Sequence, residues 1–556
     1  MLSIVDTIID GISKALNTLD ADADADGLIH LERPARPEHG DFSSNICLVI
    51  AKRLGMTPRL LAERLAAAIQ ADPFEDLVKA EVAGPGFLNF YLDKSYLHKI
   101  LREVLLAGED NYARHTFGEG QKVQLEFVSA NPTGPLHVGN GWLGSYGDAL
   151  ARLLERTGHS VTREYYVNDT GNQIRVLGES LLARKEGREV PEDGYRGEYV
   201  GEIAAGYDGP NDVVSAGRFA ASEILSNIKS TLERIGIHYD SWYSQASIEE
   251  SGKVDGMIAQ LKAEGLVYEQ EGATWLAATK LGDNRDRVLV KANGDITYLA
   301  GDLAYHKNKF LERQFDKVID IFGADHHGQV ASLKAGVKAL GIEPERLEVL
   351  LGQLVSLAGK KMSKRAGTYV KLDDLVNELG PDATRILSLL SSIDQATTLD
   401  LDLVTSQSAE NPVFYIQYAY ARISSMQVLA RERGLVAASE IFGANRSLTD
   451  DETLSALLCG VDFTLLAHPR EIQLMKAMSL LPEVVEQATT ERAPHKVTTW
   501  VRGLAADFHG FYHDCRILGE NVDAELANAR YCLVEAVRTS LRIGLSLLGV
   551  TAPERM

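Results

Sequence analysis

The chain has 556 residues, of which 45% are hydrophobic and 24% are charged. This composition is typical of a globular protein of two to four domains, and it excludes a fibrous or wholly disordered chain. Taken alone, the formal net charge of −21 at pH 7 argues against a nucleic-acid partner, because phosphate contacts require Lys and Arg, but it does not exclude a local basic face.

The N-terminal segment and the cysteines predict a cytoplasmic protein. Residues 1–27 have apolar residues at helical spacing without a basic region before them, and their uncharged stretches are too short to span a bilayer. The cysteines lie far apart with no C-x-x-C pair, which indicates reduced thiols and neither disulfides nor a zinc site; they are Cys47, Cys459, Cys515 and Cys532. We expect no membrane and no DNA among the partners.

Residues 1–110 predict a small α+β domain. They open with an amphipathic helical pattern, and the acidic repeat at 20–26 is typical of a solvated turn. Near the end, a Gly-Pro-Gly turn precedes an alternating strand at residues 87–92.

Residues 111–400 predict an α/β domain with a Rossmann-like parallel sheet. The run VQLEFV is typical of a buried strand, residues 141–157 have helical periodicity, and VTREYYVN supplies a second strand. A β-α-β unit of this kind implies parallel pairing. Further strand patterns occur at RVLVKA, KVIDIFGA and LEVLLGQLVSL, and a polar, mostly helical insertion is expected at about 175–285.

Residues 401–556 show long helical patterns without strand patterns, which predicts an all-α bundle. Tyr415, Tyr418 and Arg422 are spaced to share a helix face, and unpaired bases can stack on such aromatic side chains. An aromatic core stripe explains the same spacing equally well.

The segment SANPTGPLHVGNGWLG, from Ser129 to Gly144, lies between a predicted strand and a predicted helix. Its Gly and Pro residues let the backbone approach a ligand, and a helix N-terminus attracts phosphate. His137 and Asn140 can both donate hydrogen bonds to a triphosphate. For the segment alone, a purely structural turn is an equally good interpretation.

The same segment contains GNGWLG, which matches the G-x-G-x-x-G pattern of dinucleotide-binding proteins. In those proteins the first glycine follows the strand almost directly, whereas here about ten residues, including Pro132 and Pro135, intervene. An NAD-dependent oxidoreductase is therefore the less favoured hypothesis.

The segment GKKMSKRAGTYV, from Gly359 to Val370, places four cations between two glycines in an acidic protein. A cationic loop of this kind suits a polyphosphate whose charge must be stabilised as it leaves. The alternative is an ordinary solvated surface loop.

Together, the two segments resemble the H-x-G-H and K-M-S-K-S signatures of class I aminoacyl-tRNA synthetases, in the same order and at a similar separation. Within that class the closest resemblance is to arginyl-tRNA synthetases, and it covers nearly the whole chain. The segments that carry it are HGDFSSN, VAGPGFLNFYL, SANPTGPLHVGN, REYYVNDTGNQI, GDITYLAGDLAYH, FGADHHGQ, KMSKRAGTYV, NPVFYIQYAYARI, FYHDCR and APERM.

The resemblance implies ATP-dependent attachment of L-arginine to tRNA(Arg) through an arginyl-adenylate. ATP would enter with Mg²⁺ held mainly by its own phosphates, and no permanent metal or organic cofactor is expected. The first domain would contact tRNA, the second would be catalytic and the third would bind the anticodon. The oligomeric state stays open, with a monomer as the working assumption.

The resemblance also implies the site residues. The catalytic set is His137, Asn140, Lys361 and Lys364. The ATP-binding set is Pro132, Gly134, His137, Gly139, Asn140, Met362, Ser363 and Lys364. The arginine-binding set is Glu126, Asn131, His137, Tyr298, Asp302 and His326. Carboxylates suit a guanidinium that leaves water, and Asp302 and Glu126 are the strongest candidates for selecting the side chain.

Two positions depart from the family pattern. Asn140 stands where the first signature usually has His, and Trp142 stands where Arg is common. Each change removes a cation from the predicted ATP site. A synthetase-like paralogue that binds tRNA without charging it efficiently is therefore a further alternative.

Overall fold

The computed structural model describes residues 4–19, 25, 27–34, 36–353, 355–358, 370–400, 411–432, 451–519 and 522–556. The chain forms two compact units. Unit 1 comprises Met1–Leu106, Leu435–Ser479 and Cys515–Ala536, and unit 2 comprises Ala107–Gly434, Leu480–Asp514 and Val537–Met556. The predicted site residues Lys361, Met362, Ser363 and Lys364 lie outside the described residues.

Unit 1 contains an antiparallel sheet in the order β1-β2-β4-β3, with helices packed against it. Its N-terminal elements are α1 (Ile4–Leu19), β1 (Leu31–Glu32), η1 (Pro37–His39), β2 (Phe42–Ser44), α2 (Ile46–Ile50), α3 (Pro58–Ala71), β3 (Leu77–Ala83), β4 (Phe87–Leu92) and the start of α4 (Ser95–Asn111). Helix α3 begins at a proline, and the Thr57 hydroxyl before it accepts from the Leu60 N–H. The later elements are α17 (Asp451–Cys459), η8 (Phe463–Leu465), α18 (Pro469–Ser479) and the first half of α21 (Ala524–Leu547).

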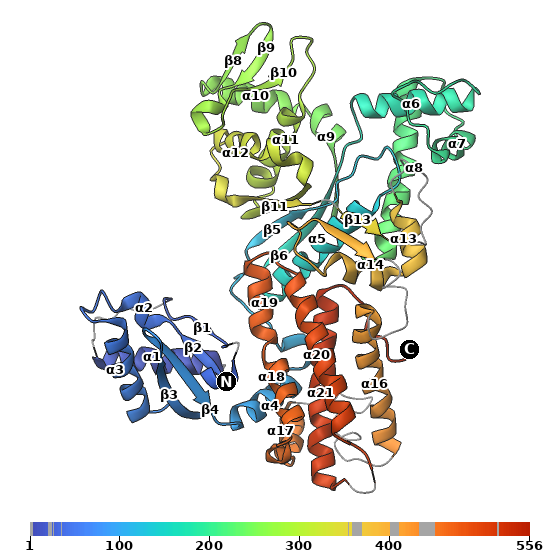
Figure 1. Cartoon of the computed structure of the whole chain (residues 1–556). Coiled ribbons are helices and arrows are strands. Elements are labelled where there is room, and N and C mark those ends of the chain that lie inside the picture. Colours follow the sequence, from blue (N-terminus) through green and yellow to red (C-terminus); the bar gives the residue numbers. More distant parts are fainter. Residues whose placement is uncertain are drawn as a thin grey trace. The chain divides into compact units, whose positions relative to one another are not determined.

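The described part of unit 2 is centred on a sheet of five parallel strands in the order β12-β11-β5-β6-β7 (Figure 1). These strands are β5 (Lys122–Glu126), β6 (Ser160–Val167), β7 (Ser241–Ser244), β11 (Lys317–Gly323) and β12 (Leu347–Gly352). The inner strands β5, β6 and β11 are largely buried, and beside their apolar residues they carry the buried polar side chains Gln124, Glu126, Glu164 and Asp320. Helix α5 (Val138–Arg156) connects β5 to β6.

The strand order reverses between β5 and β11, because the chain runs from β5 to β6 on one side while β11 pairs with β5 on the other. Ligands of open α/β sheets bind at the carboxyl ends of the strands at such a point. The predicted parallel α/β fold is confirmed.

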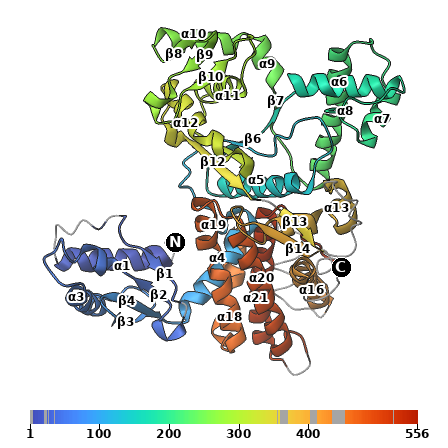
Figure 2. The same ribbon diagram turned by 45° about the horizontal axis from the view of Figure 1, so that its top comes forward.

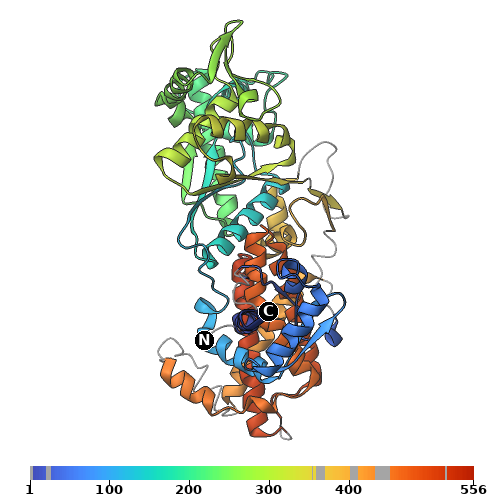
Figure 3. The same ribbon diagram turned by 90° about the vertical axis from the view of Figure 1, so that its left-hand side faces the viewer.

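Two groups of elements make up the rest of the sheet-containing part of unit 2. The first group is α6 (Asn172–Lys185), α7 (Glu198–Ala205), α8 (Val213–Arg234), α9 (Gln245–Glu250), α10 (Lys253–Ala263), β8 (Val267–Gln270), β9 (Ala273–Leu276), η2 (Ala278–Leu281) and β10 (Arg287–Val290). The hairpin of β8 and β9 stands at the top of Figures 1 and 3. The second group is α11 (Tyr298–Lys307), the π-helix η3 (Asn308–Glu312), η4 (Ala324–Gln329), α12 (Val330–Ala339), η5 (Pro344–Arg346), β13 (Val355–Ala358), α13 (Leu372–Leu379), α14 (Pro381–Ser388) and β14 (Thr397–Asp400).

The helices α16 (Pro412–Glu432), α19 (Leu481–Thr490) and α20 (His495–Asp514) complete unit 2, and α20 packs on both α16 and α19 (Figure 2). Among the described residues, no helix combines the length and the apolar character that a membrane crossing requires.

Candidate active site

The turn that holds His137 and Asn140 forms the start of α5. His137 is the N-cap residue, with φ −99° and ψ 169°. Asn140 Oδ1 accepts a hydrogen bond of 3.0 Å from the His137 backbone N–H. The amide oxygen of Asn140 therefore supports the helix start, and its Nδ2 has no partner among the described residues and can donate to a ligand. His137 is exposed, and the partial burial of its ring lowers its pKa.

The glycines of GNGWLG serve helix packing. Gly139, Gly141 and Gly144 all lie inside α5, and a Cβ on Gly141 would come within 2.4 Å of the Leu372 side chain. A dinucleotide fingerprint needs its first glycine in the turn directly after the strand. The position of these glycines inside α5 is therefore not that of a dinucleotide fingerprint and argues against the NAD hypothesis.

Trp142 belongs to the core. It is buried and packs with Val138, Leu375 and Leu387. Its side chain therefore stabilises the contact of α5 with α13 and α14.

The chain that follows the second signature is fixed beside His137. The Val138 N–H donates to the Val370 carbonyl at 3.2 Å, and the Leu372 N–H donates to the Leu136 carbonyl at 2.8 Å. His137 and Lys371 form an antiparallel bridge between these two bonds. The signatures are more than 200 residues apart in the sequence, yet the end of one lies against the other.

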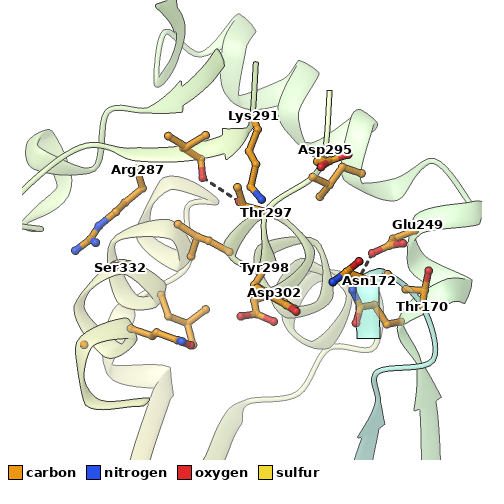
Figure 4. A pocket seen from close by; sticks show the side chains of 18 of the residues that line it. Thr170, Asn172, Glu249, Arg287, Lys291, Asp295, Thr297, Tyr298, Asp302 and Ser332 are labelled. Carbon is orange, nitrogen blue, oxygen red and sulfur yellow. Dashed lines mark hydrogen bonds between the residues drawn. The ribbon is translucent and has the colours of Figure 1, made fainter. Parts of the chain in front are cut away.

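A cavity of about 1020 Å³ opens in unit 2 between α11, α9, β10 and the start of α12. Tyr298 and Asp302 lie at its centre, with Arg287 and Ser332 on one side and Asn172 and Glu249 on the other (Figure 4). Tyr298 is the first residue of α11 and is 71% exposed, so its ring is available to a ligand. Asp302 is half-buried, and burial raises the pKa of its carboxyl to about 6.

Glu126 ends β5 and is buried. Its Oε2 accepts from Lys309 Nζ at 2.7 Å, and its Oε1 accepts from the Ser129 hydroxyl at 3.0 Å. Burial raises the pKa of Glu126, and the Lys309 ammonium acts in the opposite direction. Both carboxylate oxygens are thus held by groups of the protein.

Two further predicted residues are Asn131, on the loop after β5, and His326, in the 3-10 helix η4. Asn131 is exposed, and its amide bonds Asn168 at 2.6 Å and Gln173 at 2.7 Å. His326 is half-buried in η4, and its ring centroid lies 5.5 Å from that of Phe322, which lines the cavity.

The loop that contains Pro132 and Gly134 is tied to α7. The Tyr199 hydroxyl donates to the Thr133 carbonyl at 2.6 Å, and burial raises the pKa of this tyrosine to about 12. A Cβ on Gly134 would lie 3.3 Å from the same hydroxyl.

Sequence reasoning missed several residues that shape this site. Lys309, His306 and Asp320 form a buried charged group next to Glu126, and Glu249 and Gln329 line the cavity. One signal was present in the sequence: Asp320 is a lone carboxylate inside the apolar run VIDIF. A charge in such a strand is tolerated when it is paired, which predicts a buried cation nearby.

Comparison with known proteins gives a consistent result along the chain. Residues 6–92 match a family model described as "Arginyl tRNA synthetase N terminal domain". Residues 101–192 and 220–404 match "tRNA synthetases class I (R), catalytic domain", and residues 416–556 match "DALR anticodon binding domain".

Individual relatives match over nearly their full length. The arginine–tRNA ligase of Moorella thermoacetica is 45% identical over 95% of this chain and 93% of its own. That of Frankia alni is 43% identical over 100% and 99%. The structure of Thermus thermophilus arginyl-tRNA synthetase has a TM-score of 0.76 at 22% identity and covers 100% of both chains, which supports the fold. The chain thus belongs to the arginyl-tRNA synthetase family of class I.

Proposed function

We propose that this chain attaches L-arginine to tRNA(Arg) in two steps, with the side chain of arginine bound at Asp302. The observation that carries the proposal is the Asp302 carboxylate, which lines the cavity of a class I synthetase domain beside an exposed tyrosine. A half-buried carboxylate forms a charge-assisted bond with a guanidinium and disfavours neutral analogues.

In the first step, an oxygen of the arginine carboxylate attacks the α-phosphorus of ATP. The bond to the bridging oxygen breaks, and pyrophosphate leaves with the electron pair. His137 and Asn140 would donate hydrogen bonds from the start of α5, and Lys361 and Lys364 would supply positive charge to the leaving pyrophosphate. The Mg²⁺ that accompanies ATP would be held mainly by the phosphates and would add to this stabilisation. No covalent enzyme intermediate is needed.

In the second step, the 2′-hydroxyl of the terminal adenosine of tRNA attacks the arginyl carbonyl, and AMP leaves. Pro132, Gly134, Gly139, Met362 and Ser363 would line the nucleotide, and Glu126, Asn131, Tyr298 and His326 would complete the arginine pocket. Positioning and electrostatics supply the rate.

The partners and the location follow from the same proposal. Residues 1–110 and 401–556 would bind tRNA, the latter at the anticodon, and residues 111–400 would carry out the chemistry. We propose a cytoplasmic monomer with no DNA or membrane partner and no resident cofactor.

The test is to incubate the protein with ATP, Mg²⁺, total tRNA and each amino acid in turn. Only arginine should become attached. Attachment of another amino acid would refute arginine as the substrate. If no amino acid were attached, the alternative of a synthetase-like paralogue that charges tRNA poorly would be favoured, and the departure at Asn140 is the argument for that alternative.

The Asp302→Asn variant tests whether Asp302 binds the arginine side chain. It keeps the size of the side chain and removes its charge, so we expect the arginine KM to rise roughly 10- to 150-fold, from about 1.5–3 kcal/mol for a charge-assisted bond. The ATP KM should change little. An unchanged arginine KM would exclude Asp302 from the pocket.

A further inference from the structure

Lys309 joins two buried carboxylates from neighbouring strands. Its ammonium lies 2.7 Å from Glu126 Oε2 and 2.9 Å from Asp320 Oδ1, and its side chain is 0% exposed. The Tyr305 ring lies over it, with the centroid 4.2 Å from Nζ. Glu126 and Asp320 are partners in the register of β5 and β11, so the sheet itself places both carboxylates around one cation.

Glu126 is an ionised acceptor in this geometry. The Ser129 Oγ accepts from the Tyr166 N–H at 3.0 Å, so its own hydrogen points to Glu126 Oε1. Lys309 supplies the donor at Oε2. Each oxygen of Glu126 therefore faces a donor, and the ammonium compensates its charge.

His306 lies beside the second carboxylate, that of Asp320. Its Nε2 lies 2.9 Å from Asp320 Oδ2, and its Nδ1 lies 2.7 Å from the Asp302 carbonyl oxygen. Both partners are acceptors, so a ring that donates to both of them is protonated on both nitrogens. Burial alone would raise the pKa of Asp320, but Lys309 and His306 outweigh it and lower this pKa to about 2.

With this ring protonated, two cations balance two anions, and the carboxylates that line the cavity are Asp302, Glu249 and Asp295. Among the residues that the structure describes, the Asp302 side chain has neither a hydrogen-bond partner nor an ion-pair partner, and it faces the cavity. The two predicted guanidinium-binding carboxylates, Glu126 and Asp302, are therefore electrostatically different.

We propose that Lys309 is a positioning residue of the arginine site, which neutralises Glu126 and fixes its orientation, so that the charge that selects the substrate side chain comes from the carboxylates that line the cavity, Asp302 first among them. This proposal rests on the proposed function, because it assigns roles within the same arginine pocket. It makes Glu126 an oriented hydrogen-bond acceptor whose own charge is already compensated.

The test is a substitution cycle measured by steady-state charging of tRNA with arginine. In Glu126→Gln, Lys309 is left without one of its two anions, so a surplus positive charge repels the guanidinium, and we expect the arginine KM to rise at least tenfold. Adding Lys309→Met removes the surplus charge, and the arginine KM of this double variant should fall at least fivefold from that of Glu126→Gln. The ATP KM should stay within twofold of the parent value throughout.

Lys307→Met in the Glu126→Gln background is the matched control. Lys307 is the neighbouring lysine on the same helix end, is half-buried, and donates to Gln260 at 2.6 Å without contacting the carboxylates. It should give no recovery. Equal arginine KM values for Glu126→Gln and its Lys309→Met double variant would overturn the proposal, because Glu126 would then pair with the guanidinium directly.

A second comparison covers the case in which Glu126→Gln does not fold. The charge-balanced Glu126→Gln/Lys309→Met variant should then have an arginine KM at least fivefold below that of Asp302→Asn, and the opposite order would overturn the proposal. If the parent protein attaches no arginine, the proposed function itself has failed, independently of these variants.

Discussion

At the scale of single residues, the carboxylates of the site differ in whether a cation lies beside them. Glu126 and Asp320 are buried against Lys309, whereas Asp302 sits at the cavity with a pKa raised to about 6 by burial. An uncompensated carboxylate that is partly removed from water is strongly stabilised by an incoming cation. The same property makes the site sensitive to pH.

We expect arginine binding to weaken in mild acid. The Asp302 carboxyl has a folded-state pKa of about 6, so as the pH falls through 6 it becomes neutral and loses its attraction for the guanidinium. The kcat/KM for arginine should therefore decline below about pH 6. Since kcat/KM reports the free enzyme, the profile should be measured at constant ionic strength with saturating ATP and tRNA. Asp302→Asn should lack this decline, and a profile identical to that of the parent would assign it to another group.

Asn140 has two roles that substitutions can separate. Its Oδ1 supports the start of α5, and its Nδ2 is placed to donate to phosphate. Asn140→Ala should slow single-turnover adenylate formation by a factor of roughly 2–13, from a neutral hydrogen bond of about 0.5–1.5 kcal/mol. Asn140→Asp keeps the acceptor and suits a helix N-terminus, but its charge repels the triphosphate by about 1 kcal/mol or more.

Asn140→Asp should therefore have an unchanged or higher Tm and yet react about fivefold slower than the parent, or slower still. Asn140→His should be as active as the parent or more so. Parental rates in both Asn140→Ala and Asn140→Asp would show that Asn140 does not contact ATP.

At the scale of elements, α5 carries the first signature and is closely packed within the catalytic unit. Its buried residues cover nearly the whole helix from Val138 to Leu154. Gly141, Gly144 and Gly147 recur every three residues, and a Cβ on Gly147 would lie 2.3 Å from the Phe127 ring. The glycines thus bring the helix against the sheet residue that follows Glu126, which fixes the signature relative to the carboxylates.

Gly147→Ala tests this packing. The added methyl group overlaps the Phe127 ring, and overpacking costs about 1–3 kcal/mol, which exceeds the gain in helix propensity of about 1 kcal/mol in most of that range. We expect a lower Tm in thermal unfolding. Gly256→Ala in α10 is the matched control, because its Cβ would meet nothing within 4 Å. It should raise stability by about 0.5–1 kcal/mol, and equal effects of the two substitutions would contradict the packing argument.

At the scale of the whole molecule, an acidic chain divides into two units, and the catalytic unit is assembled from segments far apart in sequence. Arg385 in α14 is the centre of one such assembly within unit 2. Its guanidinium donates to Asp148 at 2.5 Å, to the Leu548 carbonyl at 2.8 Å and to the Ile235 carbonyl at 2.9 Å. One buried side chain therefore ties α5 to the residue that follows α8 and to the residue that follows α21.

Arg385→Met should destabilise the protein by about 3–5 kcal/mol, because it removes the buried cation beside the Asp148 carboxylate and leaves two buried carbonyls without their donor. The control is Arg152→Met, which removes a 30% exposed partner of the same Asp148 carboxylate and should cost about 1 kcal/mol or less. Thermal or urea unfolding measures both. Similar losses would show that Arg385 is not the main partner.

The sequence by itself determined the family, the fold class and the two signatures, because each depends on residues close together along the chain. A strand pattern, a helix start at His137 and a cluster of lysines can be recognised locally, and the family resemblance assigns Glu126 and Asp302 to the arginine pocket. The sequence could not decide between two interpretations of the glycines in the first signature. The pattern G-x-G-x-x-G occurs both in a phosphate-binding turn and in a closely packed helix.

Only the tertiary structure decided which carboxylate keeps its charge for a ligand. Lys309 and Glu126 are 183 residues apart, and their pairing exists because β5 and β11 are neighbours in the sheet. Only the structure shows that the segment after the second signature lies beside His137. Backbone hydrogen bonds hold it there, and no side-chain pattern encodes them. Compensation of a buried charge depends on distances of a few ångströms between residues far apart in the chain, so composition and spacing leave it undetermined.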